Sequence, residues 1–333
     1  MINRYDNFTR LRETILGKVN YSTLSLIKDA KDKELMSDIL RETESSLDEL
    51  EKILRSFDIK IWRPEVYDHN ASTVLGSPYT KIDNVYASLT PFDNFLTLAD
   101  TVVEMSPCDM PSSTFDHVQY QHIWRQKFQE GSRWISMPRP SYNNKMIESN
   151  STMPNFEPYA DSPSLLVIGD TVFVAEHFMV NILGMEWLKR EFPQFKFKVF
   201  TGTHAHLDGY FTVIRPGLAL SGISKTNLPE DFQNWDIIEF DKENYHDVTM
   251  ISDYFQDDDY ENTTLAVNML SIDPENIVMC RHAIDAAPNQ IKKLERCGVN
   301  VIPVKMDVAR WLNQGLSCFT NTIVRDGDLV NYF

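Results

Sequence analysis

The stretch FLTLADTVVEM, at Phe95–Met105, contains two short β-favouring runs separated by the turn pair Ala99-Asp100. The same arrangement returns as LLVIGDTVFV at Leu165–Val174, with Gly169-Asp170 at the turn. Turn residues between apolar, β-rich runs are typical of a β-hairpin. The pattern occurs three more times, at Phe211–Leu220, Val267–Met279 and Thr322–Val330. The sequence therefore predicts five hairpins, and self-similarity of this kind is typical of repeat architectures.

The chain between the hairpins carries helical patterns. An amphipathic helix with apolar residues at three- and four-residue steps is predicted over Asp32–Phe57, followed by a short strand at Ile59–Trp62. Shorter helices are predicted at His122–Glu130, Val180–Phe192 and Asp285–Cys297. Hairpin-plus-helix units without linkers between them predict one ring-shaped α/β domain that spans residues 1–333. Radial repetition also protects the edges of the sheets.

The charge and hydrophobicity of the chain argue against proteins that bind nucleic acid or span a membrane. The 32 Lys and Arg residues against 48 Asp and Glu residues give a net charge of −16, a field that repels nucleic acid. No stretch approaches the roughly 18 apolar residues of a membrane span, and the polar start MINRYD lacks the apolar run of a secretory signal. We therefore expect a cytoplasmic protein that acts on small molecules rather than on membranes or nucleic acid.

A polar residue precedes or begins the first strand of each predicted hairpin. In a ring of repeats, equivalent positions converge on one axis, so these side chains should meet at a common centre. Such a centre would combine carboxylates, a nearby histidine and a thiol, which is the composition of an active site. The residues in this register are Asp93, Asp161 or Ser164, Asp208, Asn268 and Cys318.

The thiol in this register is Cys318. Most free cysteines are small buried hydrophobic residues, but Cys318 follows a glycine at the start of a hairpin. A thiol needs a cationic neighbour to become a thiolate at neutral pH, and a histidine or a cationic substrate would serve. We read the other cysteines, Cys108, Cys280 and Cys297, as structural free thiols.

The segment His204-Ala205-His206-Leu207-Asp208 has two interpretations. The H-x-H-x-D spacing is that of a zinc-binding loop in metallo-β-lactamase-like hydrolases, although Gly209 stands where that family continues with histidine. The second interpretation makes His206 a general acid and base beside a carboxylate, because imidazole exchanges protons near neutral pH. We expect His204 to be structural and no metal to be held.

Asp93 and Asp161 each lie in a segment that would, in isolation, be a turn or a helix cap. Two carboxylates that face one pocket also match the fork of a planar guanidinium, which donates two N–H groups to each carboxylate. One of the two could instead orient the imidazole, as the carboxylate of a catalytic triad does.

Several longer motifs identify a family. The chain resembles the amidinotransferases within the wider superfamily of enzymes that modify guanidino groups. The resemblance rests most specifically on His-x-Asp at 206–208 followed by Arg215-Pro216-Gly217, and on Gly-x-x-Cys-x-Thr at 315–320. Further counterparts are FTRLRETILG at 8–17, WRPE at 62–65, QEGSRWISMPRP at 129–140 and LGMEW at 183–187.

The resemblance implies a five-bladed α/β propeller of pseudo-fivefold ββαβ-type repeats, and transfer of an amidino group from arginine without metal or organic cofactor. It implies that Cys318 is the nucleophile, His206 the acid and base, and Asp161 the carboxylate that orients it. Asp93 and Asp208 would hold the guanidinium, and Lys225 would bind the carboxylate of the donor. Because the family is often dimeric, a homodimer is a further expectation.

This sequence departs from the family pattern at a few positions. Phe92 stands where the family usually has arginine, Ser317 where it has histidine, and Ser164 where it often has Asp or Asn. We expect glycine as the acceptor, giving ornithine and guanidinoacetate. The alternatives are an arginine deiminase-type hydrolase that gives citrulline, or a zinc metallo-hydrolase.

Overall fold

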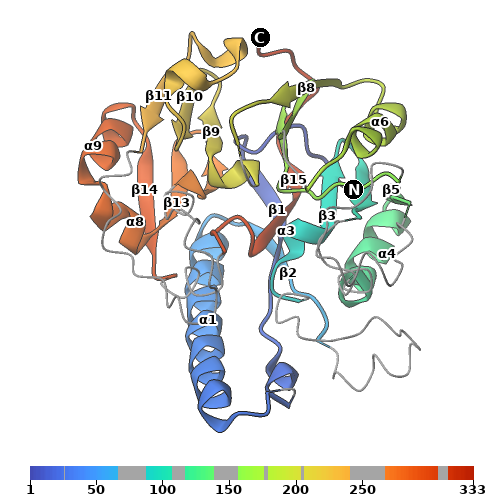
Figure 1. The fold of residues 1–333 in the computed structure, drawn as a ribbon, viewed down its shortest axis with the longest axis vertical. Helices are drawn as coiled ribbons and strands as arrows, with labels where there is room; N and C mark the ends of the chain where they lie inside the picture. Colours follow the sequence, from blue (N-terminus) through green and yellow to red (C-terminus); the bar gives the residue numbers. More distant parts are fainter. Residues whose placement is uncertain are drawn as a thin grey trace.

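The computed structural model describes nine ranges of the chain: 1–25, 27–66, 88–106, 117–138, 157–175, 179–203, 206–240, 267–306 and 314–333. Within them the strands form five sheets of three strands each (Figure 1). In every sheet the middle strand is antiparallel to one neighbour and parallel to the other. The parallel neighbour follows the middle strand in the sequence, and a connecting segment returns the chain to the same end of the sheet before this strand begins.

The sheets are the blades of a propeller, numbered here in chain order. The first blade holds β3 (Phe95–Leu98), β4 (Thr101–Glu104) and β5 (Arg133–Ser136), and the second holds β6 (Leu165–Ile168), β7 (Thr171–Ala175) and β8 (Lys196–Phe200). The third holds β9 (Phe211–Arg215), β10 (Leu218–Ser221) and β11 (Asp236–Glu239), and the fourth holds β12 (Leu270–Asp273), β13 (Asn276–Cys280) and β14 (Asn300–Val304). The fifth combines β15 (Thr320–Arg325), β1 (Leu11–Leu16) and β2 (Lys60–Trp62).

The fifth blade corrects one predicted hairpin. The first four hairpins are confirmed, but the strand of the fifth does not turn back at Gly327 to pair with Leu329-Val330. β15 pairs instead with the N-terminal β1, and Figure 1 shows these two strands side by side near the middle of the molecule. The carbonyl of Val330 accepts a hydrogen bond of 2.8 Å from the amide of Asp170 in the second blade. The two ends of the chain therefore close the ring.

Hydrophobic clusters join each blade to the next. One cluster packs Leu96 of the first blade with Val167 of the second, and another joins the second and third blades through Phe173 and Phe211. The largest joins the third, fourth and fifth blades, and the last joins the fifth to the first through Ile15. Because every blade is buried between two neighbours, its strands are apolar on both faces, which explains the runs seen in the sequence.

The helices cross between the second and third strands of the blades. α1 (Ala30–Ser56) follows the predicted range and buries Leu40, Leu47, Leu50 and Leu54, and Asp29 caps its first turn. α4 (Gln121–Gln129) and α6 (Ile182–Glu191) also match their predictions. The predicted helix at Asp285–Cys297 is instead two helices, α8 (Arg281–Ala286) and α9 (Pro288–Arg296), because Pro288 begins a new helix. The third blade has short 3₁₀ turns at this position, η4 (Lys225–Asn227) and η5 (Glu230–Phe232).

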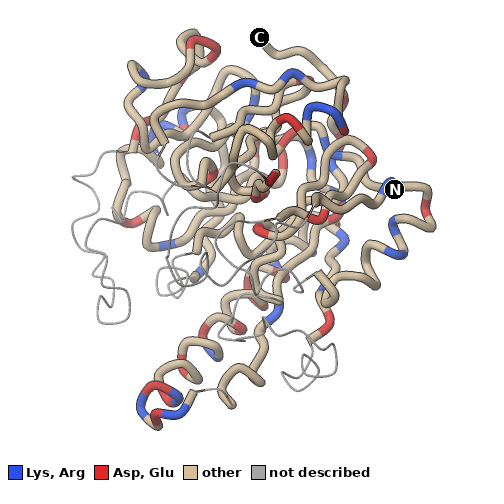
Figure 2. The backbone as a smooth tube through the Cα atoms, turned by 45° about the vertical axis from the view of Figure 1, so that its right-hand side comes forward, with Lys and Arg blue, Asp and Glu red and all other residues tan. Residues whose placement is uncertain are grey.

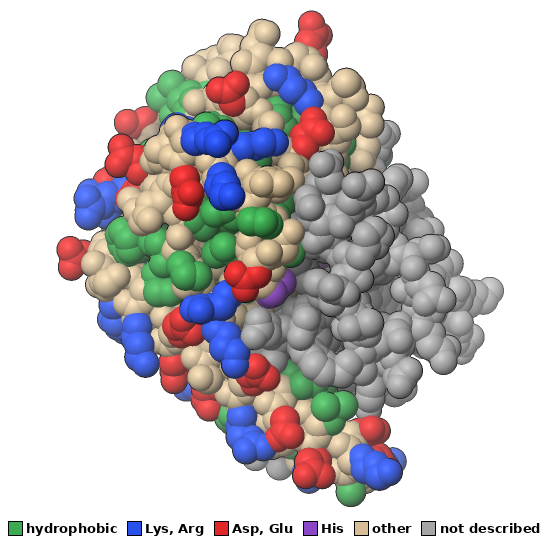
Figure 3. All heavy atoms as spheres, turned by 90° about the vertical axis from the view of Figure 1, so that its left-hand side faces the viewer, with side chains coloured by type: hydrophobic (Ala, Val, Ile, Leu, Met, Phe, Trp, Pro, Cys, Tyr) green, Lys and Arg blue, Asp and Glu red, His purple; other side chains and the backbone are tan. Residues whose placement is uncertain are grey.

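Charged residues of both signs are spread over the blades and along α1 (Figure 2). The face in Figure 3 likewise mixes acidic and basic groups with hydrophobic ones. No helix among the described residues is long and apolar enough to cross a membrane.

A glycine in α6 fixes how that helix packs beside the segment that leads to Asp161. A Cβ at Gly184 would lie 2.1 Å from the carbonyl oxygen of Tyr159. We expect Gly184→Ala to destabilise the fold by about 1–3 kcal/mol, although alanine favours helices, because the backbone must move. Urea unfolding measures the loss. Gly222→Ala is the control, since its Cβ would meet no atom closer than 3.7 Å, and equal stability of the two variants would contradict the prediction.

Candidate active site

The first strands of the blades all begin at one end of the ring, and this brings the predicted polar residues together. Asp93 lies in α3 (Pro91–Asn94) directly before β3, and Asp161 lies four residues before β6. His206 and Asp208 flank the start of η3 (Leu207–Gly209), which leads into β9. Cys318 lies in the turn before β15. Five segments distant in sequence thus contribute to one centre, with Asn268 before β12 completing the set.

His206 and Asp161 form a hydrogen-bonded pair in the centre. The imidazole Nε2 lies 2.6 Å from Oδ2 of Asp161. The other oxygen of Asp161 accepts hydrogen bonds from the amide of Ser164, at 3.2 Å, and from the Ser164 hydroxyl. Asp161 is 2% exposed, so its carboxylate has a fixed position and orients the ring of His206.

Asp208 is the centre of a second network. Its Oδ2 accepts hydrogen bonds from the Ser317 hydroxyl at 2.6 Å and from Nδ2 of Asn268 at 2.9 Å, and the Cys318 Sγ lies 4.0 Å away. The Asn268 side chain also accepts a bond of 2.7 Å from the Ser317 amide. Asn268 therefore ties the turn that carries Cys318 to the carboxylate of Asp208.

Asp93 completes the cluster. Its Oδ1 is buried and has no hydrogen-bond partner among the described residues. Burial raises the pKa of Asp93 to about 7, with nearby Asp161 and Asp208 adding to the rise, while His206 and a hydrogen bond with Thr90 oppose it. An unpaired buried carboxylate oxygen beside two further carboxylates is a site that favours a cation carrying N–H donors.

The charges of the cluster act on the two groups that could perform chemistry. Burial lowers the pKa of His206, but the charge and hydrogen bond of Asp161, with Asp93 and Asp208, raise it to about 10. Burial raises the pKa of the Cys318 thiol well above its usual value, and the charges of Asp208 and Asp93 raise it further. The resting site therefore holds a protonated imidazole and a neutral thiol, and a bound cation would favour the thiolate.

Not all predicted residues lie in this centre. Lys225 makes no bond to the cluster within the described ranges: its ammonium donates a hydrogen bond of 2.6 Å to the carbonyl of Trp235, and its amide bonds Glu239. His204 and Cys108 lie outside the described residues. In the described part of the chain, no group of three or more His, Cys, Asp or Glu side chains is arranged to hold a metal ion.

The connecting role of Asn268 is not deducible from its sequence position alone. A Cβ at Gly315 would lie 2.0 Å from the Asn268 Cγ, so the absence of a side chain there admits the amide beside the thiol turn. The sequence does contain this signal, a glycine three residues before a candidate nucleophile, but its partner becomes identifiable only in three dimensions.

The fold and the centre together define a class: a five-bladed α/β propeller with a thiol, a histidine–aspartate pair and two further carboxylates at the start of its inner strands. No family model matches the chain. It is 26% identical over 304 residues to inosamine-phosphate amidinotransferase 1 of Streptomyces glaucescens, covering 88% of this chain and 83% of the relative. It is 24% identical over 321 residues to the mitochondrial glycine amidinotransferase of Xenopus laevis, covering 89% and 72%.

Solved structures agree with these relatives. An amidinotransferase from Microseira wollei, of the saxitoxin biosynthetic pathway, matches all of this chain and 99% of its own with a TM-score of 0.80 and 21% identity. The inosamine-phosphate amidinotransferase of Streptomyces griseus matches with a TM-score of 0.78 and 21% identity, again over all of this chain and 99% of its own. The amidinotransferase relatives that align with most of this chain support the amidinotransferase family and an enzyme that transfers amidino groups, and the two solved amidinotransferases share its fold.

Proposed function

We propose that the protein transfers the amidino group of L-arginine to a primary amine through a covalent amidino-cysteine at Cys318, and releases ornithine. The observation that carries the proposal is the buried cluster in which Cys318, the His206–Asp161 pair and two further carboxylates meet. A thiol, a proton donor and a cation site are the three components that this reaction requires.

The carboxylates account for donor binding. A guanidinium carries five N–H groups, which point outward in one plane. In our proposal the free Oδ1 of Asp93 and the Oδ2 of Asp208 accept hydrogen bonds from different edges of this plane. Binding would replace the repulsion among buried carboxylates with attraction. The same positive charge would lower the pKa of Cys318, so the thiol releases its proton to solvent and the thiolate nucleophile forms only with the donor in place.

In the first half-reaction the Cys318 thiolate forms a bond to the central guanidinium carbon. The bond from this carbon to Nδ of ornithine then breaks, and His206 gives its proton to the leaving amine. Because His206 is protonated at rest through Asp161, the proton is available when the amine departs. An amidino-thioether, which keeps the positive charge, remains on Cys318.

In the second half-reaction an acceptor amine gives a proton to the neutral His206 and attacks the amidino carbon. The carbon–sulfur bond breaks and the thiolate is regenerated, so atoms and charge balance over the cycle. Cys318 and His206 thus act in the second half-reaction as the reverse of the first, which a ping-pong reaction between two amines requires.

The acceptor in our proposal is glycine, which would give guanidinoacetate, and an aminocyclitol phosphate is the second candidate. Relatives of both kinds, glycine and inosamine-phosphate amidinotransferases, cover most of the chain. Ser317 is the residue we expect to influence this choice, since its hydroxyl bonds Asp208 beside the thiol, where the family usually has histidine.

Product analysis tests the proposal. Purified protein with arginine and glycine should yield equal amounts of ornithine and guanidinoacetate, and arginine with an aminocyclitol phosphate separates the second acceptor. Dimethylarginine dimethylaminohydrolase shares the fold with a TM-score of 0.61 at 14% identity, so water as acceptor is the competing outcome. Citrulline formed with or without an amine would reject the transferase and support the hydrolase.

The pKa of Asp93 gives a prediction for donor binding. Its folded value of about 7 lies above the usual 3.8, so the carboxyl is protonated in more acidic solution and attracts a guanidinium less. Arginine affinity, measured by calorimetry in Cys318→Ala, should rise up to about tenfold per pH unit from 5.5 to 7 and then level off. His206 contributes no change here, because its pKa is about 10.

In the same background, Asp93→Asn should bind arginine about 30-fold or more weakly, with no pH dependence left from Asp93. Asp170→Asn, at a hairpin turn paired with Lys196, is the control and should behave as its parent does. A pH-dependent affinity that survives Asp93→Asn unchanged would assign the titration to another group.

We also propose that residues 1–333 act as one domain, because β1 and β15 of the same sheet come from its two ends. From the amino-acid sequence we further propose a cytoplasmic location, and from the family resemblance a homodimer; the oligomeric state is measurable by light scattering.

A further inference from the structure

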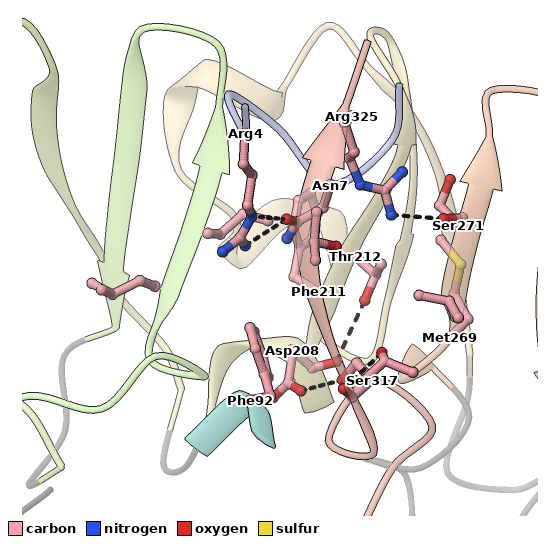
Figure 4. A pocket seen from close by; sticks show the side chains of 15 residues that line it. Arg4, Asn7, Phe92, Asp208, Phe211, Thr212, Met269, Ser271, Ser317 and Arg325 are labelled. Carbon is pink, nitrogen blue, oxygen red and sulfur yellow. Dashed lines mark hydrogen bonds between the residues drawn. The ribbon is translucent and has the colours of Figure 1, made fainter. Parts of the chain in front are cut away.

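A cavity of about 50 Å³ lies among the first strands of the blades. Figure 4 shows Asp208 and Ser317 at one end of it and the guanidinium groups of Arg4 and Arg325 at the other. Both arginines are only 1% exposed, which makes them two of the largest fully buried side chains of the described chain. A volume of this size is sufficient for a few waters or a small ion.

The two guanidiniums bond almost entirely to neutral acceptors. Arg4 donates to the Asn7 side chain at 3.1 and 2.6 Å and to the carbonyl of Thr97 at 3.0 Å. Arg325 donates to the carbonyls of Thr9 and Ser271, the latter at 2.7 Å, and its Nε has no hydrogen-bond partner. Arg325 thus uses two bonds for five N–H groups and keeps a buried donor unsatisfied.

The charges at this end of the cavity do not balance. Asp6 acts on both arginines through space and the partly exposed Asp273 acts on Arg325, but no ion pair joins Asp6 to either arginine within the described residues, and Oδ2 of Asp6 is buried without a hydrogen-bond partner there. One Asp6 oxygen accepts three bonds from Phe8 and Thr9. Burial lowers the pKa of Arg4 to about 9, with Arg325 adding to the fall, and burial lowers the pKa of Arg325 to about 10. Two buried cations that share one buried carboxylate, Asp6, leave one positive charge uncompensated among the buried groups, which is costly to the fold.

We propose that this end of the cavity binds a small inorganic monovalent anion of halide size between Arg4 and Arg325, with the free Nε–H of Arg325 as one donor. The anion compensates the excess positive charge and satisfies the open donor. Neither arginine belongs to the amidino-transfer centre, so this site is separate from the proposed function and does not depend on it.

Crystals grown in sodium bromide test the site directly. We expect an anomalous peak within hydrogen-bond distance of the Arg325 Nε, which sodium gluconate at equal ionic strength does not give. Density that refines as water alone, with no anomalous signal, would overturn the proposal.

Thermal unfolding is the second measurement. Chloride or bromide at about tenfold above its Kd should raise the Tm by about 2 °C over gluconate at matched ionic strength. Arg325→Gln should lose this halide-dependent shift whatever its own Tm, and Arg4→Gln gives a second variant if the first does not fold. Arg12→Gln, which removes an exposed pair with Asp326, is the matched control and should keep the shift. Equal halide shifts in all variants, or none in the parent, would contradict the site.

Discussion

Cys318→Ala is expected to abolish amidino transfer, with a loss of at least about 10⁴-fold in kcat, because the proposed covalent intermediate forms on its thiol. The variant should still bind arginine, since the carboxylates of Asp93 and Asp208 remain. Because the Cys318 thiol is neutral in the absence of substrate, its removal leaves the charge of the cluster unchanged.

Ornithine release under saturating arginine measures this loss. Cys297→Ala is the matched control, because Cys297 is a partly buried free thiol in the turn after α9, and it should retain parental activity. Substantial turnover by Cys318→Ala would assign the chemistry to another nucleophile or to an activated water.

Asp161→Asn is expected to lower kcat by about 10²–10⁴-fold while it leaves the fold intact. An amide has nearly the shape of the carboxylate, but it provides no negative charge for His206 at 2.6 Å. Since the charge of Asp161 is the principal cause that raises the pKa of His206 to about 10, that pKa should fall in the variant. The imidazole would then be deprotonated at lower pH and would less often carry the proton for the departing ornithine.

The pH profile of kcat separates this role from a structural one. The limb on the alkaline side should move to lower pH in Asp161→Asn, whereas a loss of fold would scale the whole profile without shifting it. Asp170→Asn, at the opposite end of the β6–β7 hairpin, should show neither effect. An unshifted alkaline limb would remove Asp161 as the partner that sets the pKa of His206.

The sequence predicts most of the ring because its hairpins are local. Four of them are joined by turns of a few residues, so each pattern contains both partners. The fifth prediction is wrong for the opposite reason. β15 pairs with β1, so that Leu16 lies opposite Thr320, and a local turn pattern cannot reveal partners so far apart in the sequence. Similarly, the helical pattern of apolar residues continues through Pro288, so it predicts one helix where the structure has two.

The site follows the same division. The register of polar residues at the strand starts is sequence information. The structure gathers Asp93, Asp161 and Asp208 around His206, and it brings Cys318 beside Asp208. Side-chain direction is not sequence information: the ammonium of Lys225 donates to the Trp235 carbonyl, a partner that the sequence does not indicate. The burial of Arg4 beside Arg325 depends on the meeting of the two chain ends, and no local pattern indicates it.

Mass spectrometry of the intact protein after mixing with arginine, in the absence of any acceptor amine, tests the covalent mechanism most directly. We predict a mass gain of one amidino group, located by peptide mapping at Cys318, absent from Cys318→Ala and removed when an acceptor amine is added. Turnover of arginine with no adduct under rapid quenching, or an adduct on a different residue, would contradict transfer through Cys318.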